Sequence, residues 1–264
     1  MTESTLPRRQ RILVVVAHPD DAEFMCGGAL ARWRDEGHQI HFCLCTDGNH
    51  GSSDPLMTPE RLVGIRQAEQ RAASAHVGAE VTFLNFVDAE LEPTLELRKA
   101  ITREIRRFRP HLVVCQDPSL FYFDTYVNHP DHRAAGEACM AAVMPAASTR
   151  LIFPELLVDN LEPHEVSEVY LMGTANADTW VAFNESQLEN KLAALREHKS
   201  QLGDWEPTEM LREWGVSTAQ RAREAGIECD YAEGFKRIVL RNVEEVLVQE
   251  AAGGEAAASS AGSQ

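Results

Sequence analysis

The chain has 264 residues, 44% of them hydrophobic, which is enough to bury a sizeable core in one α/β domain with an appended segment. Aspartate and glutamate number 41 against 25 lysines and arginines, so the formal net charge is -16. This charge disfavours attraction to nucleic acid or to an anionic membrane, and it favours a small, mostly uncharged substrate.

The amino-terminal region carries no segment long enough for a signal-peptide core or a membrane span, because its apolar run covers only residues 12–16. Six cysteines are spread along the chain without a Cys-x-x-Cys pair, which is typical of reduced core thiols. Both features predict a cytoplasmic protein. We expect a flexible leader over 1–10, a single domain over 11–250 and a disordered tail over 251–264, where Ala, Gly, Ser and Glu dominate.

Apolar runs alternate with segments of helical periodicity in the first half of the chain. This alternation predicts strands over 11–17, 39–45, 81–86 and 111–116, and helices over 22–35, 60–76 and 95–108. The helices end near Gly37, Gly78 and Pro110. Strands connected by helices in this order form a parallel sheet through right-handed crossovers, so we expect an α/β fold with helices on both faces of the sheet.

The second half is less regular. An aromatic loop over 119–127 leads into a predicted helix over 133–144. Further strands are predicted over 151–158, 168–172, 180–183 and 235–240, and further helices over 184–202 and 208–225. We therefore expect an α+β extension that follows the parallel sheet.

A polar cluster, AHPDDAE at residues 17–23, follows the first strand directly. Open α/β sheets build their sites at the carboxyl ends of strands, so we expect the chemistry here. His18 and Asp21 can turn toward one point. Asp20 must then point elsewhere, which makes it a candidate general base beside that point. Taken alone, the two aspartates are also typical of a helix cap.

A second cluster, NHPDH at residues 128–132, offers His132 as a third ligand. Two imidazoles and one carboxylate are typical of a catalytic zinc ion that keeps a position for water. His129 would then lie beside the substrate and, when protonated, donate a hydrogen bond to an oxyanion, with Asp131 orienting it and raising its pKa. Taken alone, this segment is also typical of a helix start with Asn128 as its N-cap.

These motifs, in this order, resemble those of the LmbE-like, or PIG-L, zinc-dependent de-N-acetylases. The resemblance runs from about residue 11 to residue 201 and includes further segments: Gly27 with Gly28, Thr46–Gly48 (TDG), Arg66 with Glu69, and His198–Gln201 (HKSQ). It implies a Rossmann-like sheet and a set of roles: Zn²⁺ ligands His18, Asp21 and His132, base Asp20, and oxyanion-binding His129 with its partner Asp131. Family members deacetylate N-acetylglucosamine conjugates, so a small-molecule N-acetylated sugar conjugate is the implied substrate and a homo-oligomer the implied assembly.

The resemblance also implies that Arg66 and Asp88 hold sugar hydroxyls. Arg66 could instead pair with Glu69 on the helix surface, and Asp88 could be a turn residue. His198 matches a family position, where it would either contact substrate or pack a long helix against the sheet.

The aromatic residues of 119–126 depart from the family's pattern, and loops on a rigid scaffold set specificity, so the exact substrate stays open. These side chains suit stacking on a sugar or an apolar aglycone, a hydrophobic lid, or a subunit contact. The predicted activity is metal-dependent hydrolysis of an acetamide. A metal-dependent phosphoesterase, an amidase for a larger N-acyl conjugate and a non-catalytic binding module remain alternatives. Iron or cobalt would fit the same ligands as zinc.

Overall fold

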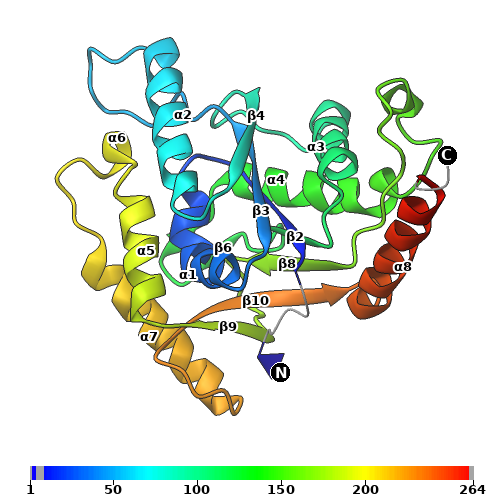
Figure 1. Ribbon diagram of the computed structural model, residues 1–264. Coiled ribbons are helices and arrows are strands. Elements are labelled where there is room, and N and C mark those ends of the chain that lie inside the picture. The colour runs from blue at the N-terminus through cyan, green and yellow to red at the C-terminus, as the bar shows by residue number, and fades with distance from the viewer. Residues whose placement is uncertain (1, 4–8, 262–264) are drawn as a thin grey trace.

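An eight-stranded sheet forms the centre of the computed structural model, which describes residues 2–3 and 9–261 (Figure 1). Its strand order is β1-β9-β10-β8-β5-β2-β3-β4. The strands are β1 (Thr2–Glu3), β2 (Arg11–Val16), β3 (Gln39–Thr46), β4 (Glu80–Phe86), β5 (Leu112–Gln116), β8 (Glu168–Met172), β9 (Thr179–Phe183) and β10 (Tyr231–Val239). Neighbouring strands run parallel except for β10, which is antiparallel to β8 and to β9. The predicted parallel sheet is confirmed, and the antiparallel β10 belongs to the predicted extension.

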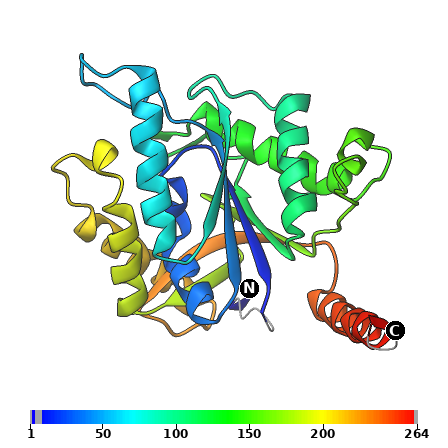
Figure 2. The same cartoon turned by 45° about the horizontal axis from the view of Figure 1, so that its top comes forward.

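Helices cover both faces of this sheet (Figures 1 and 2). They are α1 (Asp21–Asp35), α2 (Pro59–Ala75), α3 (Leu95–Phe108), α4 (Pro130–Ala141), α5 (Glu185–Leu195), α6 (Lys199–Leu202), α7 (Thr208–Glu224) and α8 (Val243–Ala261). Helices α3 and α4 pack on one face of β2, while α1 packs on the other and carries α5 against it. Helix α7 packs on β10.

The valine-rich strand β2 shows why the sheet lies at the centre. Its side chains alternate between two buried clusters: Leu13 and Val15 join the core beneath α3 and α4, and Val14 and Val16 join the core beneath α1. A strand that is apolar on both faces requires helices on both faces. Strand β2 therefore ends in the middle of the molecule, and the residues after it emerge between β3 and β5.

Two predicted elements in the second half are wrong. No strand forms over 151–158; a short 3-10 helix, Pro154–Leu157, takes its place after Phe153, which has a left-handed φ of 52°. Proline lacks the N–H that a strand ladder needs, and Leu151 and Val158 are exposed, so no core favours a strand. The predicted helix over 184–202 divides into α5 and α6, because the backbone of His198 leaves the helical region (φ -80°, ψ 57°).

The described parts of both termini contain regular elements. Thr2–Glu3 of the predicted leader pair with β9, while residues 1, 4–8 and 262–264 lie outside the described residues. The predicted tail continues helix α8 to Ala261, and alanine is the strongest helix former. Glu250 of α8 binds the side chains of Arg11 and His111, which fastens this helix to the sheet. Among the described residues, no helix has the length and apolar character that a membrane crossing requires.

Candidate active site

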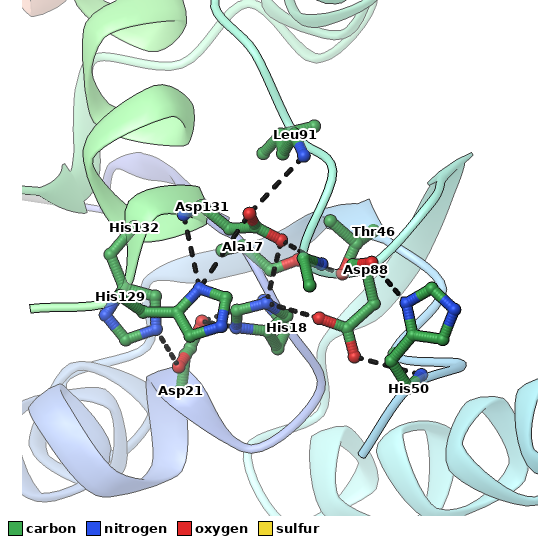
Figure 3. Close-up of polar contacts among 12 residues, drawn as sticks. Ala17, His18, Asp21, Thr46, His50, Asp88, Leu91, His129, Asp131 and His132 are labelled. Carbon is green, nitrogen blue, oxygen red and sulfur yellow. Dashed lines mark hydrogen bonds and ion pairs between the residues drawn. The ribbon is translucent and has the colours of Figure 1, made fainter.

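Three of the predicted ligands meet at the carboxyl end of β2 (Figure 3). His18 follows the strand, Asp21 begins α1, and His132 lies in the first turn of α4. Their ligand atoms all lie within 4.8 Å of one another, and all three residues are buried. His132 Nε2 is 3.0 Å from Asp21 Oδ1, and His18 Nδ1 is 3.5 Å from Asp21 Oδ2. The two sequence clusters therefore form one group that could hold a metal ion.

The second nitrogen of each imidazole is already held by an oxygen acceptor. His132 Nδ1 lies 3.1 Å from Asn128 Oδ1, and His18 Nε2 lies 3.2 Å from Asp131 Oδ2. Protonation at these two nitrogens leaves a lone pair on His18 Nδ1 and on His132 Nε2, the atoms that face Asp21. Metal-binding histidines are normally oriented in this way, so the donor set fits a metal ion.

Gln116 is a site residue that sequence reasoning missed. It ends β5, accepts a hydrogen bond from the Ala17 amide at 3.0 Å, and donates to Asp21 Oδ2 at 3.0 Å. The backbone amide of His18 donates to the same Asp21 oxygen at 2.7 Å. Gln116 thus fixes the direction of the Asp21 carboxylate. The sequence signal was its position at the carboxyl end of the strand next to β2 in the sheet.

Asp131 contacts a different histidine from the one predicted. Its carboxylate is fully buried and binds His18 Nε2, and it accepts the backbone amides of Ala89 at 2.8 Å and Leu91 at 3.3 Å. Its distance to His129 Nδ1 is 3.8 Å, too long for a hydrogen bond. Asp131 therefore orients His18, which differs from the expected pairing with His129.

His129 is the N-cap of α4, in the place expected for Asn128. Its Nδ1 accepts the backbone amide of Asp131 at 3.2 Å, so in the neutral ring the proton lies on Nε2. Burial and the nearby charge of His18 lower the pKa of His129, although Asp131 opposes this shift. A raised pKa was expected, but here the neutral ring can act as a donor. The side chain is 38% exposed, so a substrate can reach it.

Asp88 lies directly on the site. Its Oδ1 is 3.1 Å from His18 Nε2, while Oδ2 accepts the backbone amide of His50 at 3.2 Å. Burial lowers the pKa of His18, but its hydrogen bonds to Asp131, Asp21 and Asp88 outweigh burial and raise it to about 12. A second group of possible metal ligands consists of His18, Asp88 and His129.

Asp20 lies beside the group without joining it. Its backbone is left-handed (φ 92°), it makes no side-chain cap bond, and its side chain is 15% exposed. The Arg66 guanidinium is 3.3 Å from its carboxylate and donates to the Pro19 carbonyl at 2.6 Å. Burial raises the pKa of Asp20 to about 6; Arg66 opposes that shift, and the Asp21 carboxylate adds to it. A carboxyl that titrates near neutral pH is suited to general base work.

Arg66 is buried against the backbone around Asp20 and is not paired with Glu69 on the helix surface. It also donates to the Gly48 carbonyl at 3.1 Å, and a Cβ at Gly48 would lie 2.7 Å from the guanidinium. Gly48 also has a φ of 66°, which residues with a side chain rarely adopt. The backbone conformation and the close guanidinium therefore each favour glycine at this position of the TDG segment. Glu69 binds Ser200 instead of pairing with Arg66. These contacts favour a role for Arg66 in holding Asp20 over contact with sugar.

The aromatic segment forms a two-stranded hairpin of β6 (Tyr122–Phe123) and β7 (Tyr126–Val127). Its aromatic and apolar side chains are exposed: Phe121, Tyr122, Phe123, Tyr126 and Val127. The base of the hairpin is closed by Asn128, whose amide and side chain donate to the carbonyls of Phe121 and Leu120 at 2.9 and 2.7 Å. The hairpin therefore adjoins the site through the residue that orients His132.

The chain is similar to proteins of one enzyme family. The family model described as GlcNAc-PI de-N-acetylase (PIG-L) matches residues 13–143. A diacetylchitobiose deacetylase of Thermococcus kodakarensis is 32% identical, over 75% of this chain and 74% of the relative. A 1D-myo-inositol 2-acetamido-2-deoxy-alpha-D-glucopyranoside deacetylase of Rhodococcus erythropolis is 30% identical, over 80% and 74%. A solved structure of the N,N'-diacetylchitobiose deacetylase from Pyrococcus horikoshii aligns with a TM-score of 0.77 at 28% identity, covering 87% of this chain and 84% of that one. From its motifs, its fold and these relatives, the chain belongs to the GlcNAc-PI de-N-acetylase (PIG-L) family.

Proposed function

We propose that the protein is a zinc-dependent hydrolase that removes the acetyl group from an N-acetylated amino sugar. The observation that carries this proposal is the convergence of His18, Asp21 and His132 beside a separate carboxylate, Asp20, that is partly exposed. Membership of the family and the names of its relatives support an acetamide on a glucosamine-type sugar as the substrate.

His18 Nδ1, the Asp21 carboxylate and His132 Nε2 are the atoms that would hold the zinc ion. This set is preferred over the group with Asp88 and His129, because His18 Nε2 is occupied by Asp131. With one anionic ligand, a bound zinc ion keeps net positive charge, which polarises a carbonyl and favours ionisation of water.

The chain's own residues then perform the proton transfers. Asp20 accepts a proton from the attacking water as the new C–O bond forms at the acetyl carbon. His129 donates from Nε2 to the oxyanion, and the neutral ring is sufficient for this because Nδ1 is held by the Asp131 amide. Asp20 returns its proton to the departing nitrogen as the C–N bond breaks. The products are acetate and the free amine.

Acetate release across a substrate panel tests this proposal. The panel holds free N-acetylglucosamine, its inositol and malate conjugates, diacetylchitobiose and an N-acetylated glycopeptide. Release from one member that stops with a chelator and returns with zinc is the expected result. Release with cobalt or iron but not with zinc would reject zinc as the metal but would leave the deacetylase assignment in place. Hydrolysis of a phosphoester with no acetate release from a zinc-loaded sample would overturn the deacetylase assignment. A homo-oligomer and a cytoplasmic location stay predictions.

A further inference from the structure

A buried acid and a buried histidine lie behind Asp20 and take no part in the proposed chemistry. Glu23 is 2% exposed and His198 is fully buried, and the nearest approach between them is 3.6 Å, from Glu23 Oε2 to His198 Nε2. Glu23 Oε2 and both ring nitrogens of His198 have no hydrogen-bond partner. With no exposed surface, His198 does not contact a substrate directly. Burying polar groups with so few partners costs folding free energy, so the presence of this pair calls for a functional explanation.

Gln70 connects this pair to Asp20. Its Nε2 donates to Glu23 Oε1 at 2.8 Å, and its Oε1 accepts the backbone amide of Asp20 at 3.1 Å. Gln70 is 1% exposed, and Ser74 accepts a second hydrogen bond from its Nε2 at 3.2 Å. Hydrogen bonds thus run from Glu23 through Gln70 to the peptide of Asp20, and His198 packs against the far side of Glu23 at 3.6 Å.

The side-chain amide of Gln70 can make these contacts in only one orientation. Glu23 accepts only, so the amide nitrogen of Gln70 must face it, and the amide oxygen must then face Asp20. If the amide turned over, its NH₂ would meet the Asp20 N–H, donor against donor.

The peptide held by Gln70 is in a strained conformation. Asp20 has a φ of 92°, a region that non-glycine residues rarely adopt and that persists only where the surroundings enforce it. Gln70 holds its amide, and Arg66 holds its carboxylate and the preceding carbonyl. A relaxed Asp20 peptide would swing its carboxylate away from the attacking water.

We infer that Glu23 and His198 are positioning residues: through Gln70 they hold the Asp20 peptide in its left-handed conformation and so aim the proposed base. The inference rests on the proposed function for its catalytic consequence, but the conformational restraint itself does not. It also gives a role to His198 of the HKSQ segment, for which the sequence left two readings open.

The test replaces the pair by apolar residues of similar volume, Glu23→Met with His198→Leu. Such replacements of buried ion pairs usually preserve folding. The zinc-loaded variant should keep its metal content and its KM, while kcat falls by about 10²-fold, the loss typical of a catalytic group displaced by about 1 Å. Hydrogen exchange at the Asp20 amide, measured without substrate, should become at least about tenfold faster, because the free energy of opening this peptide falls.

A matched control exists at the opposite end of the sheet. His41 and Glu104 also form a buried His–Glu pair at 3.6 Å. His41 lies near the amino end of β3, whereas Asp20 follows the carboxyl end of β2, and Glu104 also accepts hydrogen bonds from Arg107 and Thr82. Glu104→Met with His41→Leu should leave kcat, KM and Asp20 exchange at wild-type values. The same two pairs of changes are then made in an Asp20→Asn background. There the Glu23 and His198 changes should cost no further activity, because the group that they aim is gone.

Unchanged exchange at the Asp20 amide would overturn the inference, whatever happens to activity. The Glu23 and His198 changes could instead lower kcat by the same factor in the wild-type and in the Asp20→Asn background. That result would also overturn the inference, since general destabilisation of the fold gives this pattern. If the wild-type protein deacetylates nothing, the proposed function fails while the exchange experiment still decides the restraint. If the wild type is active and the variant matches it, only the inference fails.

Discussion

Replacing Asp131 by asparagine tests whether this carboxylate serves His18, as the contacts indicate, or His129, as the sequence suggested. Its two oxygens accept from three donors: His18 Nε2 and the backbone amides of Ala89 and Leu91. An asparagine has one oxygen and one NH₂ group. In its better orientation the oxygen keeps His18 and Ala89, and the NH₂ group faces the Leu91 amide, donor against donor.

The expected magnitudes follow from these contacts. One buried amide without an acceptor costs about 1–3 kcal/mol of unfolding free energy, measured on the metal-free protein in urea. The bond to His18 loses its charge, and weakening a partner of a metal-binding histidine lowers metal affinity by about 10–100-fold. A competitive chelator titration with zinc measures this second effect.

Glu168→Gln provides the matched control for the Asp131 variant. Glu168 is also a buried carboxylate, but its partner is Arg237, away from the site. This control should lose stability and keep the zinc affinity of the wild type. If Asp131→Asn binds zinc within about twofold of the wild type, a difference well below the usual effect of such a change, then Asp131 does not orient a ligand.

Four further outcomes are expected. Asp20→Asn should keep its zinc and lose about 10²–10⁴-fold in turnover, and normal turnover would reject Asp20 as the base. His132→Ala should lose its zinc, so one retained equivalent on elemental analysis would refute the ligand assignment. Phe123→Ser should raise KM for a conjugate without changing sedimentation, whereas a change of oligomeric state with unchanged KM would show a subunit contact. Burial raises the pKa of Glu104, but the nearby His41 and the hydrogen-bonded Arg107 outweigh it and lower the value from 4.5 to about 2. Glu104 therefore stabilises the fold above its unfolded pKa and loses this contribution as pH falls toward the folded value. The difference in unfolding free energy between wild type and Glu104→Gln, measured in urea, should shrink as pH falls over this range. A difference that does not depend on pH would contradict the stabilising role of the Glu104 carboxylate.

The parallel part of the fold was predictable because its strands carry a strong local signal. Valine-rich runs such as residues 12–16 end at glycine, proline or charged residues, and each is followed by helical periodicity. The failures have tertiary causes. The break between α5 and α6, where the backbone of His198 leaves the helical region, places this side chain beside Glu23, a contact that periodicity within one segment does not reveal.

The candidate site was predictable as a set of residues but not as a set of contacts. His18, Asp21 and His132 stood out because three metal-binding residue types occur at strand and helix ends. The partner of Asp131 depended on whether its carboxylate turned toward α4 or toward β2, and the adjacent position of His129 in sequence favoured His129, whereas the hydrogen bond is to His18. Gln116 carries no motif, and only the pairing of β2 with β5 places its amide between Ala17 and Asp21.

The closed base of the hairpin over 121–127 makes it a replaceable module. Asn128 is fixed by the carbonyls of Leu120 and Phe121, and the Tyr126 hydroxyl donates to its Oδ1 at 3.3 Å, so a segment of another length that keeps Tyr126 still lets Asn128 orient His132. Loops with closely spaced ends tolerate insertion at little entropic cost. A hairpin of another shape could therefore replace this one and bind a different aglycone without disturbing the metal ligands. Grafting hairpins from relatives onto this base is a direct route to altered specificity.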